Sequence, residues 1–196
     1  MRKGEATRAR ILDEAARQAA VRGLSVVSLN DVAEAVGLSK SGLFKHFDSK
    51  EAMQLAVLQS TLERFAEYVW LPASQLPAGR SRLETIFERW IAWSEVENAE
   101  GGCLIMAATS ELDDQPGPLR DVLQTQQRRW TRTLVKEFQS LREPPLSEAQ
   151  AQLAAFQMKS FFLGHNENRR LLEDADARAL AMAAFRDLLD RTVRGD

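Results

Sequence analysis

The chain has 196 residues, of which 44% are apolar and 28% are charged, and its formal net charge is −2. This is the composition of an ordinary soluble protein with enough residues to bury a core. No apolar run approaches the roughly eighteen residues of a membrane span, so no membrane partner is expected. A single cysteine cannot form an internal disulfide, and we therefore expect a reducing, cytoplasmic location.

The charge is distributed unevenly along the chain. Residues 1–50 contain nine Lys and Arg against six Asp and Glu, a net of +3, whereas the remainder contains 17 against 22, a net of −5. Because attraction to phosphates is local, a basic N-terminal part can bind DNA although the whole chain is slightly acidic.

Residues 28–53 carry the clearest pattern in the chain. Ser28 has Asp31 three positions on, which is typical of a helix N-cap with an acidic partner. An apolar face at helical spacing follows, formed by Leu29, Val32, Ala33 and Val36. Gly37 comes next, where a left-handed residue ends a helix at little steric cost. The pattern predicts a short helix that ends in a tight turn.

A second short helix is predicted from Lys40 to Phe47, with Ser39 as its N-cap. Leu43 and Phe47 point inward, and the outer side carries a polar set: Lys40, Ser41, Lys45 and His46. A helix, a glycine turn and a short exposed helix with cations and hydroxyls form the layout of a helix-turn-helix DNA reader. The other interpretation, a helical hairpin inside a core, leaves these cationic and small residues unexplained.

The rest of the chain also has the pattern of helices, because sustained apolar alternation is absent. Helices are predicted over about 50–71, 81–98, 103–111, 118–141 and 147–172, and from Asp174 or Asp176 to about Arg194. Pro72, Pro77 and Gly79 are expected to break the first of these helices. We therefore predict an all-α protein of about nine helices, with a DNA-binding domain at 1–49 and a larger helical domain at 50–196.

Residues 11–51 resemble the N-terminal domain of the TetR family of bacterial transcriptional repressors. The matches run in order through three helices and both turns: Ile11-Leu12, Ala15, Gly23-Leu24, Val32-Ala33, Gly37-Leu38-Ser39, Gly42-Leu43-Phe44, His46-Phe47 and Ser49-Lys50-Glu51. The sequence departs from the family at Gln18 and Ala19, which replace a large apolar pair, and at Phe44, where most members carry Tyr. Residues 101–130 look similar to one subgroup of C-terminal domains in this family.

The resemblance implies which residues meet DNA. Base edges would be read by Lys40, Ser41 and Lys45, and phosphates would be contacted by Ser28, Phe44, His46 and Lys50. Asn30 and Gly42 complete the expected set, and a basic arm would be added by Lys3, Arg8 and Arg10. A phosphate between Lys50 and the helix amides beside it would explain a cation at a helix N-terminus. For His46, the alternative is a partly exposed residue at a helix end.

The aromatic residues and methionines of the larger domain suit either a core or a cavity for an apolar or aromatic ligand, and both interpretations stay open. The candidate pocket set is Phe87, Trp90, Trp93, Cys103, Met106, Trp130, Met158, Phe162 and His165. His165 and Asn166 would orient a ligand, unless they lie on the surface. Cys103 has no basic neighbour in the sequence that would activate it, so an inert buried thiol is favoured over a sensor.

No second His or Cys stands at metal-ligand spacing, so no metal or other cofactor is expected. No paired carboxylates or Cys/His dyad sits at suggestive spacing either, which argues against an enzyme.

The last two predicted helices carry apolar faces that suit a subunit interface. The resemblance implies a homodimer formed through them, with an expected interface of Leu153, Phe156, Phe161, Leu180, Ala184, Phe185 and Leu188. A two-fold dimer presents two recognition helices to successive major grooves of a near-palindromic operator. We expect a repressor released by a small apolar or aromatic effector. The alternative is a DNA-binding protein of the same fold without an effector, controlled by a protein partner or by its abundance.

Overall fold

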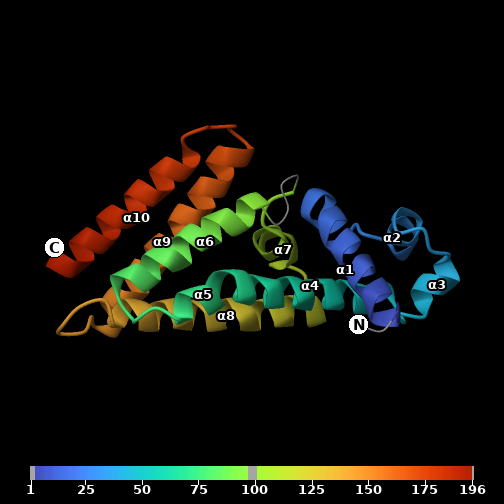
Figure 1. Cartoon of the computed structure of the whole chain (residues 1–196), viewed down its shortest axis with the longest axis horizontal. Coiled ribbons are helices and arrows are strands. Elements are labelled where there is room, and N and C mark those ends of the chain that lie inside the picture. The colour runs from blue at the N-terminus through green and yellow to red at the C-terminus, as the bar shows by residue number, and fades with distance from the viewer. Residues whose placement is uncertain (1–2, 97–100, 196) are drawn as a thin grey trace. The chain divides into compact units, whose positions relative to one another are not determined.

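The computed structural model describes residues 3–96 and 101–195, and every element in these ranges is a helix (Figure 1). The elements are α1 (Lys3–Arg22), α2 (Leu29–Ala35), α3 (Lys40–Phe44), α4 (Lys50–Phe65), the π-helix η1 (Ala66–Trp70), α5 (Leu71–Ser74), α6 (Arg80–Val96), α7 (Leu104–Leu112), α8 (Pro118–Gln139), α9 (Glu148–Arg170) and α10 (Ala177–Arg194). Since α4, η1 and α5 follow one another directly, the described residues form nine helical segments. The all-α prediction is confirmed.

The helices pack as two compact units. Over the described residues, unit 1 comprises residues 3–64 and 101–126, and unit 2 comprises residues 65–96 and 127–195. Unit 1 therefore combines α1 and the helix-turn-helix with α4 up to Arg64, with α7 and with the first part of α8. The predicted domain boundary between residues 49 and 50 stays a prediction. No helix in the described ranges has the length and apolar character that a membrane crossing requires.

The helices of the helix-turn-helix begin and end at residues that give local signals. Ser28 caps α2 by accepting from the amide of Asp31 at 3.2 Å, and Ser39 caps α3 by accepting from the amide of Gly42 at 3.1 Å. Gly37 adopts φ +70°, as its place after α2 predicts.

Helix α3 is shorter than predicted, because it ends at Phe44 and not at Phe47. The amides of His46 and Phe47 both donate to the carbonyl of Leu43, at 2.9 and 3.3 Å, so the chain tightens into a turn there. Phe47 nevertheless stays buried, as predicted.

The expectation that Pro72 breaks the long helix is wrong. The helical segment runs through η1 to Ser74, with Pro72 in the first turn of α5. Proline has no amide to offer the carbonyl four residues back, which here belongs to Tyr68. Arg89 of α6 supplies the donor through its Nε, and its guanidinium lies over the Tyr68 ring at 4.6 Å. A side chain from another helix thus replaces the missing backbone bond.

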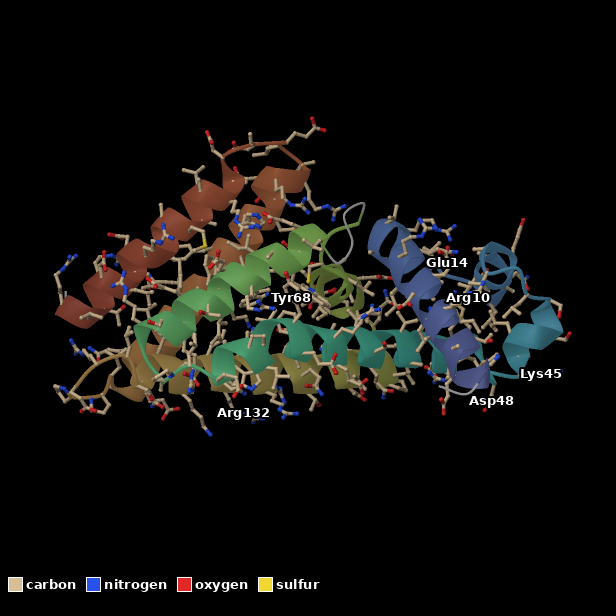
Figure 2. All side chains as sticks on the ribbon, viewed as in Figure 1. Arg10, Glu14, Lys45, Asp48, Tyr68 and Arg132 are labelled. Atoms are coloured by element: carbon tan, nitrogen blue, oxygen red, sulfur yellow. The ribbon has the colours of Figure 1, made fainter. Side chains whose placement is uncertain are left out.

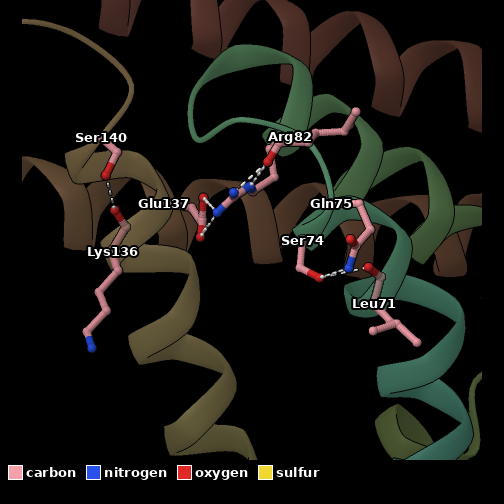
Figure 3. Close-up of polar contacts among 8 residues, drawn as sticks. Leu71, Ser74, Gln75, Arg82, Lys136, Glu137 and Ser140 are labelled. Carbon is pink, nitrogen blue, oxygen red and sulfur yellow. Dashed lines mark hydrogen bonds and ion pairs between the residues drawn. The ribbon is translucent and has the colours of Figure 1, made fainter.

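Unit 2 contains a buried ion pair that joins α6 to α8. The guanidinium of Arg82 donates to both carboxylate oxygens of Glu137, at 3.0 and 3.2 Å, and also bonds the carbonyl of Leu76 (Figure 3). Both side chains are largely buried, with Glu137 only 9% exposed. In the same unit, Ser147 and Gln150 form the predicted capping box at the start of α9.

Candidate functional site

Helix α3 presents a polar outer side and an apolar inner side. Lys40, Ser41 and Lys45 are exposed, and Figure 2 places Lys45 at the C-terminal end of this helix. Leu43, on the inner side, and Phe47, in the turn after the helix, are buried in the core of unit 1. The outer side chains are therefore accessible to a nucleic acid, and their individual contacts with bases stay predictions.

The remaining residues expected to contact DNA surround the same turn. Asn30 is exposed, and Phe44 is 40% exposed, so its ring is accessible although it lacks a hydroxyl. Ser28 and His46 are half-buried, and the hydroxyl oxygen of Ser28 is already engaged as the α2 cap. At Gly42 a Cβ would lie 3.2 Å from the Ser39 hydroxyl, so glycine leaves room for the α3 cap.

The basic residues of the expected arm hold α1 against the reading helices. The guanidinium of Arg8 lies over the Phe47 ring at 4.7 Å, and Arg10 donates to the carbonyl of Val36 at 3.1 Å. Both arginines are exposed, so their charges still face solvent. The side chain of Lys3 lies outside the described residues.

Lys50 has a partner that the sequence did not reveal. Its ammonium donates to the carbonyl of Ser25 at 2.5 Å, in the loop between α1 and α2. A carbonyl does not neutralise the charge, but a phosphate at Lys50 would have to share the ammonium with this bond. The expected phosphate contact stays a prediction.

Glu111 of α7 is a site residue that sequence reasoning missed. Its carboxylate accepts from the amides of Leu24 and Ser25, at 2.7 and 2.6 Å, in the loop that leads to α2. Burial alone would raise the pKa of Glu111, but the hydrogen bonds from Ser25 and Leu24, with Lys50 nearby, lower it below its ordinary value. Only the long-range fold brings residues 86 and 87 positions apart together, and no local signal marks the pair.

Two family descriptions match the chain. "Bacterial regulatory proteins, tetR family" matches residues 11–57, and "Tetracyclin repressor-like, C-terminal domain" matches residues 79–185, more than half of the chain. The chain belongs to the TetR family. The first match covers the helix-turn-helix described above, and the second includes α7 with Glu111.

Three similar proteins illustrate the likeness. The transcriptional repressor KstR2 of Rhodococcus jostii strain RHA1 is 39% identical over 80 residues, which are 40% of this chain and 39% of that protein, so the chain spans about two fifths of this relative. A regulator from Chloroflexus aurantiacus J-10-FL has 26% identity and a TM-score of 0.76, covering 97% of this chain and 96% of that one. AibR, solved with isovaleryl coenzyme A and operator DNA, has 20% identity and a TM-score of 0.69, covering 91% and 98%.

The aromatic side chains expected at a ligand pocket of this TetR-family protein pack on one another in unit 2. Phe65 makes edge contacts with Trp90, Trp93 and Trp130, with ring centroids 5.3 to 6.0 Å apart. Trp90 also stacks on Phe162 at 4.5 Å. We call these five residues the aromatic cluster. Its mutual contacts are those of a packed core, and ligand binding by these rings stays a prediction.

The other members of the expected pocket set are distributed differently. Phe87 packs on Phe185 with tilted rings whose centroids are 4.3 Å apart, and Met158 is fully buried in unit 2. Cys103 and Met106 belong to unit 1, where Cys103 is buried at the start of α7. The predicted set therefore does not form a single cluster within either unit.

Buried polar atoms accompany the aromatic cluster in unit 2. His165 is 2% exposed, and its Nε2 lies 3.2 Å from Glu95, which also accepts from Arg178 at 2.6 Å. Burial lowers the pKa of His165, although Glu95 opposes this shift. The Nδ1 of His165, the Oδ1 of Asn166 and the Nε1 of Trp130 are buried without a partner within the described structure. The alternative that His165 and Asn166 lie on the surface is wrong.

The residues expected at the dimer interface fall into three groups by exposure. Leu153, Phe156 and Leu180 are well exposed, and Phe156 at 68% has one of the most accessible large apolar side chains among the described residues. Phe161 and Ala184 are half-buried. Phe185 and Leu188 are buried inside unit 2, at 0% and 2% exposed, because their side of α10 packs on the subunit's own core. These two side chains are therefore unavailable to a partner subunit.

The described ranges contain no candidate metal centre. No three His, Cys, Asp or Glu side chains there are placed to hold a metal ion.

Proposed function

We propose that the protein is a transcriptional repressor that binds a near-palindromic operator as a homodimer and is released by a small apolar or aromatic effector. The observation that carries the proposal is α3, a capped and exposed helix with two lysines and a serine on its outer side. KstR2 is named as a repressor, and AibR was solved on operator DNA with isovaleryl coenzyme A. The first supports a repressor, and the second supports a DNA-binding regulator that also takes a ligand. In this proposal the protein acts in the cytoplasm.

In this proposal the roles on DNA are divided between bases and backbone. Lys40, Ser41 and Lys45 lie in the major groove, where lysine pairs with guanine edges. Ser28 and His46 fix the register by donating to phosphates. Asn30, Gly42, Phe44 and Lys50 complete the contact surface. The net charge of +3 over residues 1–50 provides the attraction that is independent of sequence.

Lys45→Ala is expected to weaken operator binding by about 1–3 kcal/mol and to relax the preference at one base pair, because a base-edge contact is lost. Binding should be measured by fluorescence anisotropy on a panel of single-base operator variants. The matched control is Lys136→Ala, which removes the same charge from an exposed residue of α8 in unit 2. If Lys45→Ala weakens binding equally to every sequence, the lysine contacts phosphate and not a base.

Dimerisation in this proposal uses the exposed side of α9 and α10. Leu153, Phe156 and Leu163 are spaced three and seven residues apart on α9, and all three are exposed. On α10, Leu180 is the exposed leucine, and Val193 near the end of the helix is also exposed. Apolar side chains at this spacing form one stripe, which a second copy can cover in a symmetric interface. The two recognition helices must then lie about 34–36 Å apart to reach successive grooves.

The effector in this proposal binds beside the aromatic cluster. The atoms that support it are the unpartnered polar atoms of His165, Asn166 and Trp130, because a buried polar group without a hydrogen bond is costly. A ligand with an apolar body and one polar group supplies the missing partners. To release the operator, the ligand must bind the two states of the dimer with different affinity, usually by about 1–3 kcal/mol.

A second candidate function is favoured by the mutual packing of the aromatic rings. If the cluster is only a core, the protein is a DNA-binding regulator without a small effector. Titrating the operator complex with a panel of apolar and aromatic compounds separates the two. Release of DNA together with a rise in Tm supports the effector, whereas neither change with any compound supports the second function.

Selection of DNA from a random pool by the purified protein tests the proposal as a whole. We expect a near-palindromic consensus with two half-sites about one helical turn apart. Selection of no sequence, or of a single half-site without symmetry, contradicts the proposed operator binding by a dimer.

A further inference from the structure

The loop between α1 and α2 is held by side chains from two other helices of unit 1. The carboxylate of Glu111, on α7, accepts from the amides of Leu24 and Ser25. From α4, Gln54 donates to the carbonyl of Leu24 at 2.7 Å, and Lys50 donates to the carbonyl of Ser25. The backbone amide and the backbone carbonyl of both Leu24 and Ser25 are thus hydrogen-bonded to side chains. We call Glu111, Gln54 and Lys50 the loop clamp.

Gly23 gives the carboxylate its access to the loop. It adopts φ +94°, a conformation that side chains other than glycine rarely take. A Cβ at this position would lie 3.3 Å from both carboxylate oxygens of Glu111. Backbone conformation and close approach therefore both favour glycine here, and the loop is shaped around the Glu111 carboxylate.

The loop clamp acts on the start of the helix-turn-helix. The residues that it holds, Leu24 and Ser25, lie four and three positions before Ser28, the N-cap of α2. Leu24 is itself buried. Because α2 and the short turn after it position α3, fixing the loop fixes where the reading helix begins.

The segment that carries Glu111 belongs to the C-terminal family match but packs with the N-terminal helices. The match covers residues 79–185, whereas residues 101–126 form part of unit 1. Gly101, in the same segment, lies so close to α1 that a Cβ would come within 2.4 Å of the Ala20 backbone. Residues of the C-terminal family match therefore contact α1 and the loop that leads into the helix-turn-helix.

We propose that Glu111 is a positioning residue for operator binding, through which α7 holds the α1–α2 loop and so sets the presentation of α3. The inference rests on the proposed repressor function and adds its regulation. While α7 keeps the carboxylate on the loop amides, the loop and the helix-turn-helix that follows it are held in the arrangement that binds DNA. A change in the C-terminal domain that withdraws α7 releases the loop and weakens specific binding without any change in the DNA-contacting side chains.

Glu111→Gln is the most direct test. The amide nitrogen of glutamine is a donor, so it places a donor opposite one of the two backbone amides. We expect operator affinity to fall about tenfold, while affinity for random-sequence DNA stays within about twofold, because phosphate attraction does not depend on the exact placement of α3. Amide exchange at Leu24 and Ser25 should accelerate about tenfold in the free protein. A variant that is merely destabilised weakens both kinds of DNA binding together.

The matched control is Asp13→Asn, which removes the same charge from the carboxylate that pairs with Arg64 at 2.6 Å in the same unit. It should leave the ratio of specific to non-specific affinity unchanged. Gln54→Met removes the bond to the Leu24 carbonyl and should lower that ratio in the same direction as Glu111→Gln.

A folded Glu111→Gln protein with wild-type operator affinity and wild-type exchange at Leu24 and Ser25 overturns the inference. Failure of the proposed function looks different, because the wild-type protein then selects no DNA. The amide exchange of the loop still tests the clamp in that case, since it is measured without DNA.

Discussion

Phe156→Glu is expected to convert the protein to a monomer and to lower operator affinity by at least about a hundredfold, because a single head loses the avidity of two linked half-sites. Phe156 is 68% exposed on α9, in line with Leu153 and Leu163. In a dimer formed through this stripe, a carboxylate at position 156 loses its hydration without gaining a partner. Sedimentation velocity measures the mass, and a mobility-shift titration measures the affinity.

The subunit itself should remain folded in this variant, because a surface substitution usually changes the unfolding free energy by no more than about 0.5 kcal/mol. Leu71→Glu is the matched control, since Leu71 is an exposed leucine on α5, a helix that contributes no residue to the proposed stripe. It should keep the wild-type mass and operator affinity. A dimeric Phe156→Glu protein would place the interface elsewhere.

Leu188 shows why sequence alone could not define this interface. Apolar residues cover a wide arc of α10, and periodicity does not say which part of the arc faces the subunit's own core. The structure turns Phe185 and Leu188 inward and leaves Leu180 exposed. Leu188→Glu should therefore unfold unit 2, so loss of DNA binding in that variant would say nothing about dimerisation.

The helix-turn-helix was predictable because its signals are local. Ser28 and Ser39 each bond an amide three residues on, and Gly37 takes its positive φ next to the helix that it ends. Such bonds depend only on the chain near them. The loop clamp was not predictable, since Glu111 meets Leu24 and Ser25 across more than 80 residues of sequence. The continuation of the long helix past Pro72 was not predictable for a similar reason. Arg89, which offsets the missing amide of Pro72, comes from another helix.

From the sequence, the candidate pocket could be inferred only from the number of aromatic residues and methionines in the larger domain. Buried aromatic residues at helical spacing are compatible with a core or with a cavity, and the aromatic cluster shows the contacts of a core. The structure adds the buried polar atoms of His165, Asn166 and Trp130 that have no hydrogen-bond partner within the described residues. An ordinary apolar core does not contain such atoms. Sequence reasoning identified His165 and Asn166 as a polar pair. It could not tell that both are buried.

Glu137→Ala is expected to lower the free energy of unfolding by on the order of 3 kcal/mol, because it leaves the charge of Arg82 largely buried without its carboxylate. Arg82 keeps its bonds to the carbonyl of Leu76, which places the expected loss at the lower end of the range for such pairs. Urea unfolding monitored by circular dichroism measures the change. Asp187→Ala is the control, because it breaks an exposed pair with Arg191 that should contribute no more than about 0.5 kcal/mol.

The double variant Arg82→Met, Glu137→Leu separates loss of attraction from the cost of an unpaired buried charge. Apolar side chains of similar volume remove both charges, so the double variant should be more stable than Glu137→Ala. Its unfolding free energy should lie closer to that of the wild type than the sum of the two single effects predicts. If the double variant is instead as unstable as that sum, Arg82 contributes mainly through its bonds to Leu76, and the ion pair with Glu137 is not what joins α6 to α8.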